Sequence, residues 1–264
     1  PADRCIDIEN AHTANTKNWF CYLGNKDTKK KISFAVIGDN HAHSMIPLFR
    51  EIAKKNNLKG ILTGFSGCPG IIGVQSIRFE KTKNCKLLAN KFHQFVKDES
   101  INKIFLVSRW TYYTDGRYNG RQFQLLTENN NLFSNKENSR TALINGLTNT
   151  VDMYNQIGTK VVFVHQAPLQ IFDPQFIYSE SFDKITNRIR IDKLKNYSVD
   201  LSESLNFQKF IRDNVKILKD QYSNLITIDL NDYFCDVSKC LVGNEKASYY
   251  ADDDHLSIYG SKFL

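Results

Sequence analysis

Near the end of the chain a carboxylate precedes a histidine by three residues, in the pattern Asp252-x-x-His255. A carboxylate this close can orient the imidazole ring and stabilise the imidazolium that forms when the ring accepts a proton. The pair therefore has the residue types of a general base and its orienting acid. A surface acidic turn followed by an ordinary histidine would give the same spacing, so the interpretation depends on the rest of the chain.

A second polar segment, 38–43 (GDNHAH), directly follows the apolar run 31–37 (KISFAVI). The glycine allows a sharp turn at the end of a strand, and the helix start that follows offers free backbone N–H groups. Taken alone, the segment is most simply explained by Asp39 capping a helix. Together with the Asp-x-x-His pattern it becomes a candidate for the other half of an active site.

A metal site is the rival chemistry, because His41, His43 and the acidic cluster 252–255 offer nitrogen and oxygen ligands. Alternating histidines share one side only in a strand, whereas this segment is expected to enter a helix. We therefore predict that the chain holds no metal.

The elements that must position these residues follow from the hydrophobic pattern. Short apolar runs predict buried strands at 31–37, 58–62, 103–107, 160–164 and 225–228. Helical spacing predicts helices at 44–56, 84–97, about 134–157 and 207–222. Ser134 and Glu137 have the spacing of a capping box at the start of the third helix.

Strands and helices thus alternate about five times, and the strands are apolar on both faces. This pattern predicts an α/β fold with three layers, α/β/α, around a central parallel sheet of about five strands. Ligand sites in such folds lie at the carboxyl ends of the strands, which is where segment 38–43 falls. Residues 109–133 look like a long loop. Residues 1–30 lack periodicity, so we expect an N-terminal extension packed on a single domain that spans 1–264.

The composition is that of a folded globular protein: 41% of the 264 residues are hydrophobic and 24% are charged. No apolar stretch approaches the roughly 18 residues that a membrane span needs. The net charge of +7 comes from lysines scattered along the chain. Because no basic stripe with interleaved aromatic residues is present, we predict a solvated basic surface and no nucleic-acid partner. An anionic glycan or a membrane surface is the second option.

Six cysteines fall into three local couples in turn-rich sequence: Cys5 with Cys21, Cys68 with Cys85, and Cys235 with Cys240. Six cysteines allow many connectivities, and six reduced thiols in a cytosolic enzyme are the alternative. The absence of a CxxC pair disfavours a zinc ribbon or a thioredoxin-type site. Reduced cysteines would leave several thiols exposed in loops, so we predict three disulfides and an oxidising compartment.

Two motifs, taken together, resemble the SGNH/GDSL hydrolases: GDxHA at 38–42 and DxxHLS at 252–257. The chain is more specifically similar to the periplasmic SGNH domains that are fused to membrane acyltransferases of acyltransferase family three. Further matches are Cys68-Pro69, VSRW at 107–110, and the Cys235 to Cys240 couple. These matches span nearly the whole chain in the expected order.

The resemblance implies a flavodoxin-like SGNH hydrolase fold and an enzyme that moves acetyl groups on bacterial surface polysaccharides such as lipopolysaccharide O-antigen. It implies a periplasmic location, with the domain tethered to the inner membrane by an acyltransferase domain that lies outside this chain. No cofactor is expected in this domain, because the membrane partner would use the acetyl donor, acetyl-CoA. A surface glycan would be the acceptor.

One position departs from the family, whose nucleophile is the serine of Gly-Asp-Ser: this chain has Asn40 there. An amide nitrogen is delocalised into its carbonyl and is a poor nucleophile, so we expect the chain as given to be inactive. Asn40 reflects either an inactivated form of an enzyme or a natural pseudoenzyme that binds glycan without turnover. The intact Asp252 and His255 favour the first. Ser44 and Ser66 lie off the strand-end turn, so neither is expected to substitute.

With serine at position 40, the resemblance implies that this serine attacks an acyl carbonyl while His255 takes its proton and Asp252 orients the ring. The backbone N–H groups of residue 40 and Gly67 would bind the oxyanion. A turn before Cys68-Pro69 explains Gly67 equally well.

The family's third oxyanion donor, an asparagine in a Gly-x-Asn-Asp block, is absent, and Arg109 and Trp110 stand in its place. Arg109 would stabilise an oxyanion or hold an acidic group of the glycan. Trp110 would stack on a sugar face, although core packing explains it equally well. Besides the glycan-binding pseudoenzyme, a free-standing secreted carbohydrate esterase remains an alternative function.

Overall fold

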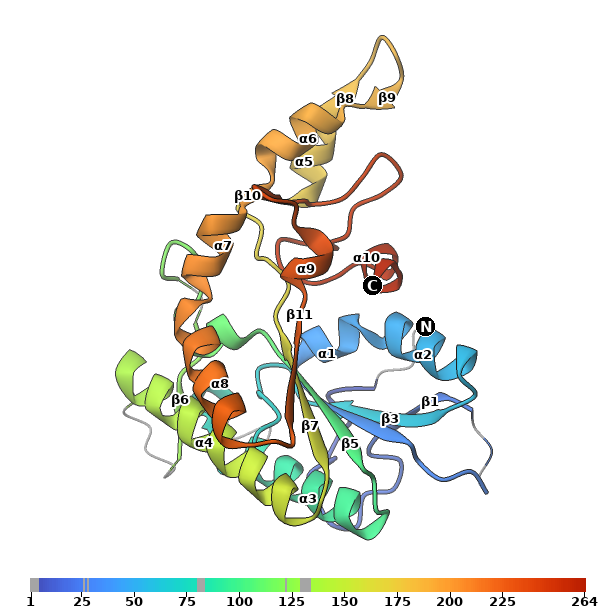
Figure 1. Cartoon of the computed structure of the whole chain (residues 1–264), viewed down its shortest axis with the longest axis vertical. Helices are drawn as coiled ribbons and strands as arrows, with labels where there is room; N and C mark the ends of the chain where they lie inside the picture. Colours follow the sequence, from blue (N-terminus) through green and yellow to red (C-terminus); the bar gives the residue numbers. More distant parts are fainter. Residues whose placement is uncertain (1–4, 26, 28, 80–83, 122, 129–133) are drawn as a thin grey trace.

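A six-stranded sheet forms the centre of the computed structural model, which describes residues 5–25, 27, 29–79, 84–121, 123–128 and 134–264 (Figure 1). The strand order is β1-β3-β2-β5-β7-β11. The strands are β1 (Cys21–Gly24), β2 (Phe34–Gly38), β3 (Lys59–Gly64), β5 (Lys103–Val107), β7 (Lys160–His165) and β11 (Leu225–Asp229). All except β1 run parallel, so the predicted parallel sheet of about five strands is confirmed.

Strand β1 corrects the expectation for residues 1–30. It pairs antiparallel with β3, in a register that sets Cys21 opposite Leu62. Only Leu23 in this strand is buried, because β1 lies at the edge of the sheet. A single buried side chain gives no alternation that could be read from the sequence. The N-terminal segment is therefore part of the sheet, and not only an extension packed on it.

Side chains that alternate along the strands enter two separate apolar cores, one on each face of the sheet. On β2, for example, Ile37 belongs to one core, whereas Phe34 and Val36 belong to the other. The helices on the first face are α3 (Cys85–Asp98), α4 (Lys136–Gln156) and α8 (Lys209–Gln221). Helices α1 (Asn40–Ser44) and α2 (Ile46–Lys55) lie on the second face (Figure 1). The predicted three-layer α/β/α arrangement is confirmed.

The predicted helices differ from the observed ones in detail. The helix predicted at 44–56 begins earlier and is divided at Met45 into α1 and α2. The helix predicted at 207–222 consists of α8 and the end of a separate helix, α7 (Leu201–Phe207).

The capping box predicted for α4 is wrong. Asn135 is the N-cap, and its side chain accepts a hydrogen bond from the backbone N–H of Asn138 at 2.9 Å. The hydroxyl of Ser134 instead donates to the carbonyl of Leu126 at 2.9 Å. An asparagine caps a helix as well as a serine does, so the two neighbours compete and the sequence alone does not rank them.

The connecting segments carry short elements. The predicted loop 109–133 contains η2 (Trp110–Tyr113) and β6 (Leu126–Thr127), while residues 122 and 129–133 lie outside the described part. A projection along the longest axis of the molecule contains α5 (Pro174–Ser181), β8 (Phe182–Asp183), β9 (Arg188–Ile189) and α6 (Ile191–Tyr197) (Figure 1). The remaining elements are β4 (Gln75–Ser76), η1 (Ile77–Phe79), β10 (Val199–Asp200), α9 (Asn231–Phe234), β12 (Lys239–Cys240) and α10 (Ile258–Phe263).

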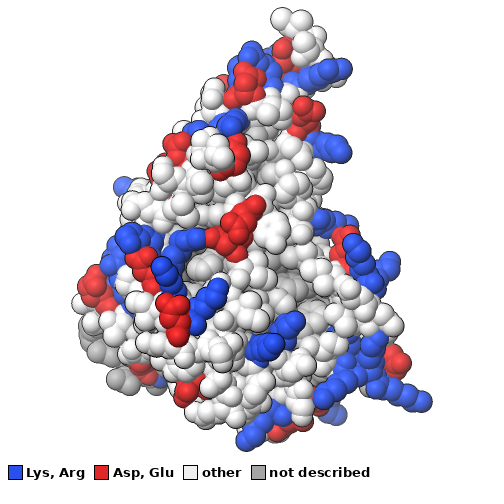
Figure 2. Space-filling model, viewed as in Figure 1, with Lys and Arg blue, Asp and Glu red and all other residues white. Residues whose placement is uncertain are grey.

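All three predicted cysteine couples form disulfides. The Cα atoms are 5.1 Å apart in Cys5–Cys21, 5.5 Å in Cys68–Cys85 and 3.8 Å in Cys235–Cys240. The first disulfide ties the N-terminal segment to β1, and the second ties the loop after β3 to the start of α3. Within the described ranges, no helix has the length and apolar character needed to cross a bilayer. Basic and acidic side chains are interspersed over the face shown in Figure 2.

Candidate active site

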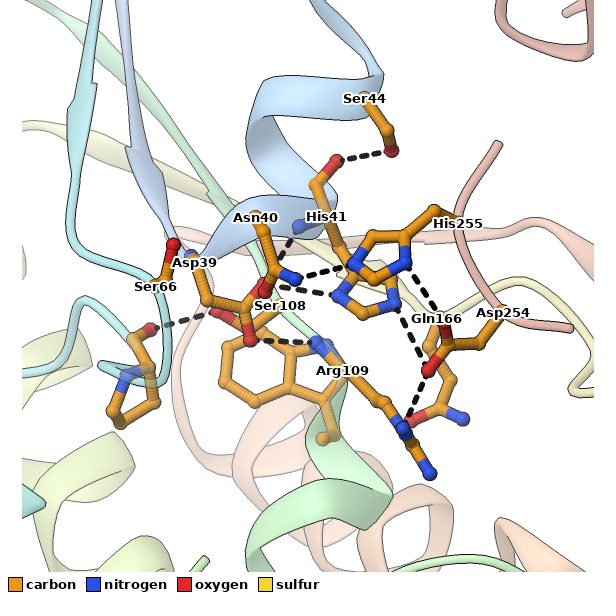
Figure 3. Close-up of polar contacts among 12 residues, drawn as sticks. Asp39, Asn40, His41, Ser44, Ser66, Ser108, Arg109, Gln166, Asp254 and His255 are labelled. Atoms are coloured by element: carbon orange, nitrogen blue, oxygen red, sulfur yellow. Dashed lines mark hydrogen bonds and ion pairs between the residues drawn. The ribbon is translucent and has the colours of Figure 1, made fainter. Parts of the chain in front are cut away.

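Four segments that are distant in the sequence meet at the carboxyl edge of the sheet. Asn40 follows β2, Arg109 follows β5, and His255 lies on the loop before α10 (Figure 3). Gly67 follows β3. Together they line a cleft of about 370 Å³. Its walls also contain His41, Ser66, Arg78, Tyr112, Arg117, Phe123, Asp252 and Asp254. The cleft lies where the parallel topology predicts a ligand site.

The turn after β2 depends on Gly38 and Asp39. A Cβ atom on Gly38 would lie 1.7 Å from a carbonyl oxygen of β5, so only glycine fits there. Asp39 caps α1 as predicted, because its carboxylate accepts from the backbone N–H of His41 at 2.9 Å. The same carboxylate accepts from the backbone N–H of Arg109 at 3.1 Å. Asp39 thus joins the turns after β2 and β5 and holds Asn40 at the start of α1.

The side chains of Asn40, His255 and Asp252 form one continuous line of contacts. The amide of Asn40 contacts Nε2 of His255 (Figure 3), and Nδ1 of the same ring lies 2.8 Å from the Asp252 carboxylate. The other oxygen of Asp252 accepts from the backbone N–H groups of His255 at 2.7 Å and Asp254 at 3.0 Å. The structure therefore brings together the three residues that the sequence assigns to the nucleophile position, the base and the orienting acid.

A fourth residue, Asp254, also contacts the ring, and the sequence did not identify it as part of this site. One oxygen of Asp254 lies 2.9 Å from Nδ1 of His255, and the other pairs with the guanidinium of Arg109 (Figure 3). Its only signal in the sequence is membership of the acidic cluster 252–254. Such a cluster does not show which carboxylate turns inward.

These contacts shift the pKa values of the ring and of both acids. Burial would lower the pKa of His255, but the hydrogen bonds and charges of Asp252 and Asp254 outweigh it and raise the pKa to about 10. Burial would raise the pKa of each acid. Hydrogen bonds from His255 nevertheless hold the pKa of Asp252 below its ordinary value. A hydrogen bond from His255 and the charges of His41 and Arg109 do the same for Asp254. At neutral pH the site is thus an imidazolium between two carboxylates.

The side chain of Asn40 can make a hydrogen bond with Nε2 of His255 whether the ring is neutral or protonated. A neutral ring with its proton on Nδ1 accepts at Nε2 from the amide NH₂ group. An imidazolium donates from Nε2, and the amide oxygen accepts after a half-turn of the side chain. Asn40 therefore fills the nucleophile position without leaving Nε2 unpaired.

Two of the residues predicted to contact an oxyanion or substrate, Gly67 and Arg109, lie in the wall of the cleft. Gly67 lines the cleft and has a φ of 76°, a left-handed conformation that favours glycine. Arg109 also lines the cleft, where its Nη2 donates to the carbonyl of Gly116 at 2.9 Å. Their roles toward substrate stay predictions.

The predicted sugar contact of Trp110 is wrong. Its side chain is 0% exposed and stacks on Phe163 with ring centroids 4.4 Å apart. The indole N–H donates to the carbonyl of Val164 at 2.8 Å. A ring enclosed in this way cannot present a face to a ligand, so Trp110 is a core residue.

The two nearby serines make their hydrogen bonds elsewhere. The hydroxyl of Ser44 donates to the carbonyl of His41 at 2.8 Å, and that of Ser66 donates to Asp7 at 2.6 Å. These contacts agree with the expectation that neither replaces the missing nucleophile.

One group of side chains in the cleft has the composition of a metal site. His41, Asp254 and His255 each offer a ligand atom within 4.8 Å of the others. Nδ1 of His255 already contacts two carboxylates, and Asp254 is already paired with Arg109. A cation there would have to displace the guanidinium, so we identify no metal ligand in this group.

A histidine between carboxylates, facing the residue after Gly-Asp at the carboxyl edge of a parallel sheet, defines an esterase-like or acyltransferase-like site. The sequence matches the family described as "SGNH domain (fused to AT3 domains)" over residues 4–264, and the protein belongs to this family. The sequence matches no protein among those with curated descriptions.

The chain is similar to several solved structures, including these three. The periplasmic domain of a lipopolysaccharide acetyltransferase from Salmonella ser. Paratyphi A has a TM-score of 0.61 and 14% identity, covering 89% of this chain and 81% of that one. A GDSL-like lipase from Bacteroides thetaiotaomicron VPI-5482 has a TM-score of 0.46 and 12% identity, with 90% and 87% covered. The acetyl xylan esterase AlAXEase has a TM-score of 0.44 and 13% identity, with 87% and 94% covered. The TM-score of 0.61 shows that this chain shares its fold with the first of these structures.

Proposed function

We propose that this domain is the O-acetyl transfer site for a bacterial surface polysaccharide, and that Asn40 makes the chain as given inactive. The observation that carries the proposal is the line of contacts from Asn40 through His255 to Asp252. The family's fusion to AT3 domains supports a membrane acyltransferase partner. We further propose that this partner takes the acetyl groups from acetyl-CoA. The same fusion and the three disulfides support a periplasmic location, tethered to the inner membrane.

With serine at position 40, we propose the following reaction, which the contacts of His255 with position 40 and Asp252 support. The hydroxyl oxygen attacks the acyl carbon as His255 takes its proton at Nε2, and the backbone N–H groups at residue 40 and Gly67 bind the oxyanion. The bond from the acyl carbon to the donor breaks, and the departing group takes the proton from His255. A sugar hydroxyl, or water, then gives its proton to His255 and attacks the acyl carbon. The bond from the acyl carbon to the serine oxygen breaks, and the serine oxygen takes the proton back from His255.

The test compares Asn40→Ser with the matched control Asn40→Ala in hydrolysis of 4-nitrophenyl acetate. The serine variant should turn over, and the unaltered protein and the alanine variant should show only the background rate. Absence of turnover in the folded serine variant would overturn the proposal. Adding a candidate polysaccharide then distinguishes transferase from esterase, because a transferase moves the acetyl group to the sugar instead of to water.

A second candidate is a glycan-binding pseudoenzyme, favoured by the hydrogen bond that Asn40 makes with His255. It predicts that the unaltered protein binds acetylated surface polysaccharide in calorimetry and that Asn40→Ser binds no better and stays inactive. A free-standing secreted carbohydrate esterase predicts instead that the serine variant deacetylates glycan without any membrane partner.

A further inference from the structure

Two carboxylates meet the same ring nitrogen. Nδ1 of His255 lies 2.8 Å from Asp252 and 2.9 Å from Asp254, although a single N–H makes one strong hydrogen bond at a time. Two carboxylates at one site repel each other unless a positive charge compensates them. The compensating charges are the protonated ring and the guanidinium of Arg109, which pairs with the far oxygen of Asp254.

Solvent screens the two carboxylates to different degrees. The side chain of Asp252 is 48% exposed, whereas that of Asp254 is 7% exposed. Water weakens the interaction of an exposed charge, so at nearly equal distance the buried carboxylate interacts more strongly with the ring. Asp252 also engages its second oxygen with the backbone N–H groups of its own turn. Asp252 therefore divides its two oxygens between the ring and the backbone of that turn.

The carboxylate of Asp254 is held in place by Arg109, which is itself anchored. Arg109 is fixed by its donation to the carbonyl of Gly116 at 2.9 Å. His41 stacks on His255 with ring centroids 4.3 Å apart, and its Nε2 lies 3.8 Å from Asp254. The ring is thus confined between a second imidazole on one face and the carboxylates at its edge.

We propose that Asp254, anchored by Arg109, is a second positioning residue for His255 and acts more strongly on it than Asp252 does. This inference deepens the proposed function and rests on it for its catalytic consequence. The titratable and charged groups around the ring are Asp252, Asp254, Arg109 and His41, together with Asp39, which lies 3.2 Å from Nδ1 of His41, and Asp253, which pairs with Arg117.

The first test needs no activity and uses the protein with Asn40 in place. The pKa of His255 is measured by NMR titration of its ring in the unaltered protein, D252N, D254N and the matched control D253N. D254N should lower the pKa of His255 by roughly 1–3. D252N should lower it by less, and D253N should leave it nearly unchanged.

D254N leaves the guanidinium of Arg109 buried without the carboxylate that balances its charge, so this variant is itself at risk of unfolding. The double variant R109M/D254N removes both charges and is measured in parallel. If D252N lowers the pKa of His255 as much as D254N and the double variant do, or more, the inference is overturned.

The second test adds Asn40→Ser and follows hydrolysis against pH. D254N should move the alkaline midpoint of kcat/KM downward and reduce the plateau value of kcat by roughly 10²-fold with KM unchanged, because a misplaced base affects the chemical step. D252N should change the alkaline midpoint and the plateau value of kcat by less than D254N does. If the serine variant is inactive, the proposed function fails, whereas the NMR comparison still decides the role of Asp254.

Discussion

The Asn40→Ser variant should be an esterase whose rate keeps rising far into the alkaline range. The ring must be neutral to accept the serine proton, and the carboxylates raise the pKa of His255 to about 10. With that pKa, roughly one ring in a thousand is neutral at pH 7. Below the midpoint, kcat/KM should therefore increase about tenfold with each pH unit.

The assay measures kcat/KM for 4-nitrophenyl acetate from pH 6 to above 10. Hydroxide also hydrolyses this ester, so the rate with Asn40→Ala is subtracted at every pH. A plateau reached near pH 7, at the ordinary pKa of a histidine, would refute the argument that two carboxylates hold the ring in its charged form.

Folding must be followed over the same range, because the same shift links stability to pH. A pKa raised on folding stabilises the folded state fully below the ordinary histidine value, and this contribution disappears as the pH rises through about 10. The lowered pKa values of Asp252 and Asp254 act in the opposite direction. Their contribution is present above the ordinary carboxyl value and is lost in acid. Circular dichroism at each pH separates loss of the fold from loss of the base.

Three further predictions concern residues around the site. Arg109→Ala removes the guanidinium that pairs with the buried Asp254, so urea unfolding should show a loss of roughly 3–5 kcal/mol. The exposed control Arg188→Ala should show almost none, and equal losses would contradict the buried pair. Trp110→Phe removes a buried hydrogen bond to Val164 and should cost roughly 2–3 kcal/mol in unfolding free energy, with KM unchanged when combined with Asn40→Ser. A raised KM would instead indicate that Trp110 does contact the substrate. Non-reducing peptide mapping should find Cys5–Cys21, Cys68–Cys85 and Cys235–Cys240, and a free thiol or another pairing would argue against an oxidising compartment.

The sequence is informative where a pattern repeats or a turn has strict requirements. The parallel strands are visible as apolar runs because both of their faces are buried. Gly38 and Asp39 are recognisable because the turn after β2 admits no Cβ atom and the helix start needs a cap. The cysteine couples are local, so their pairing follows from proximity in the chain.

Features that depend on tertiary contacts were not predictable in the same way. Strand β1 buries only Leu23 and leaves no periodic signal. Trp110 and Arg109 are neighbours in the sequence, yet one enters the core and the other lines the cleft. Asp254 differs from Asp252 and Asp253 only in which way its side chain turns, and that direction is set by Arg109, which lies 145 residues away in the chain.

The central claim is that position 40 is where an acyl group is transferred, with His255 as the base. The most direct measurement is labelling by a fluorophosphonate probe, which reacts irreversibly with an activated serine, followed by peptide mass spectrometry. The account predicts that Asn40→Ser is labelled on the peptide that contains position 40. It also predicts that adding His255→Ala abolishes the labelling and that Asn40→Ala is not labelled. A folded Asn40→Ser variant that takes up no label, or is labelled equally without His255, would contradict it.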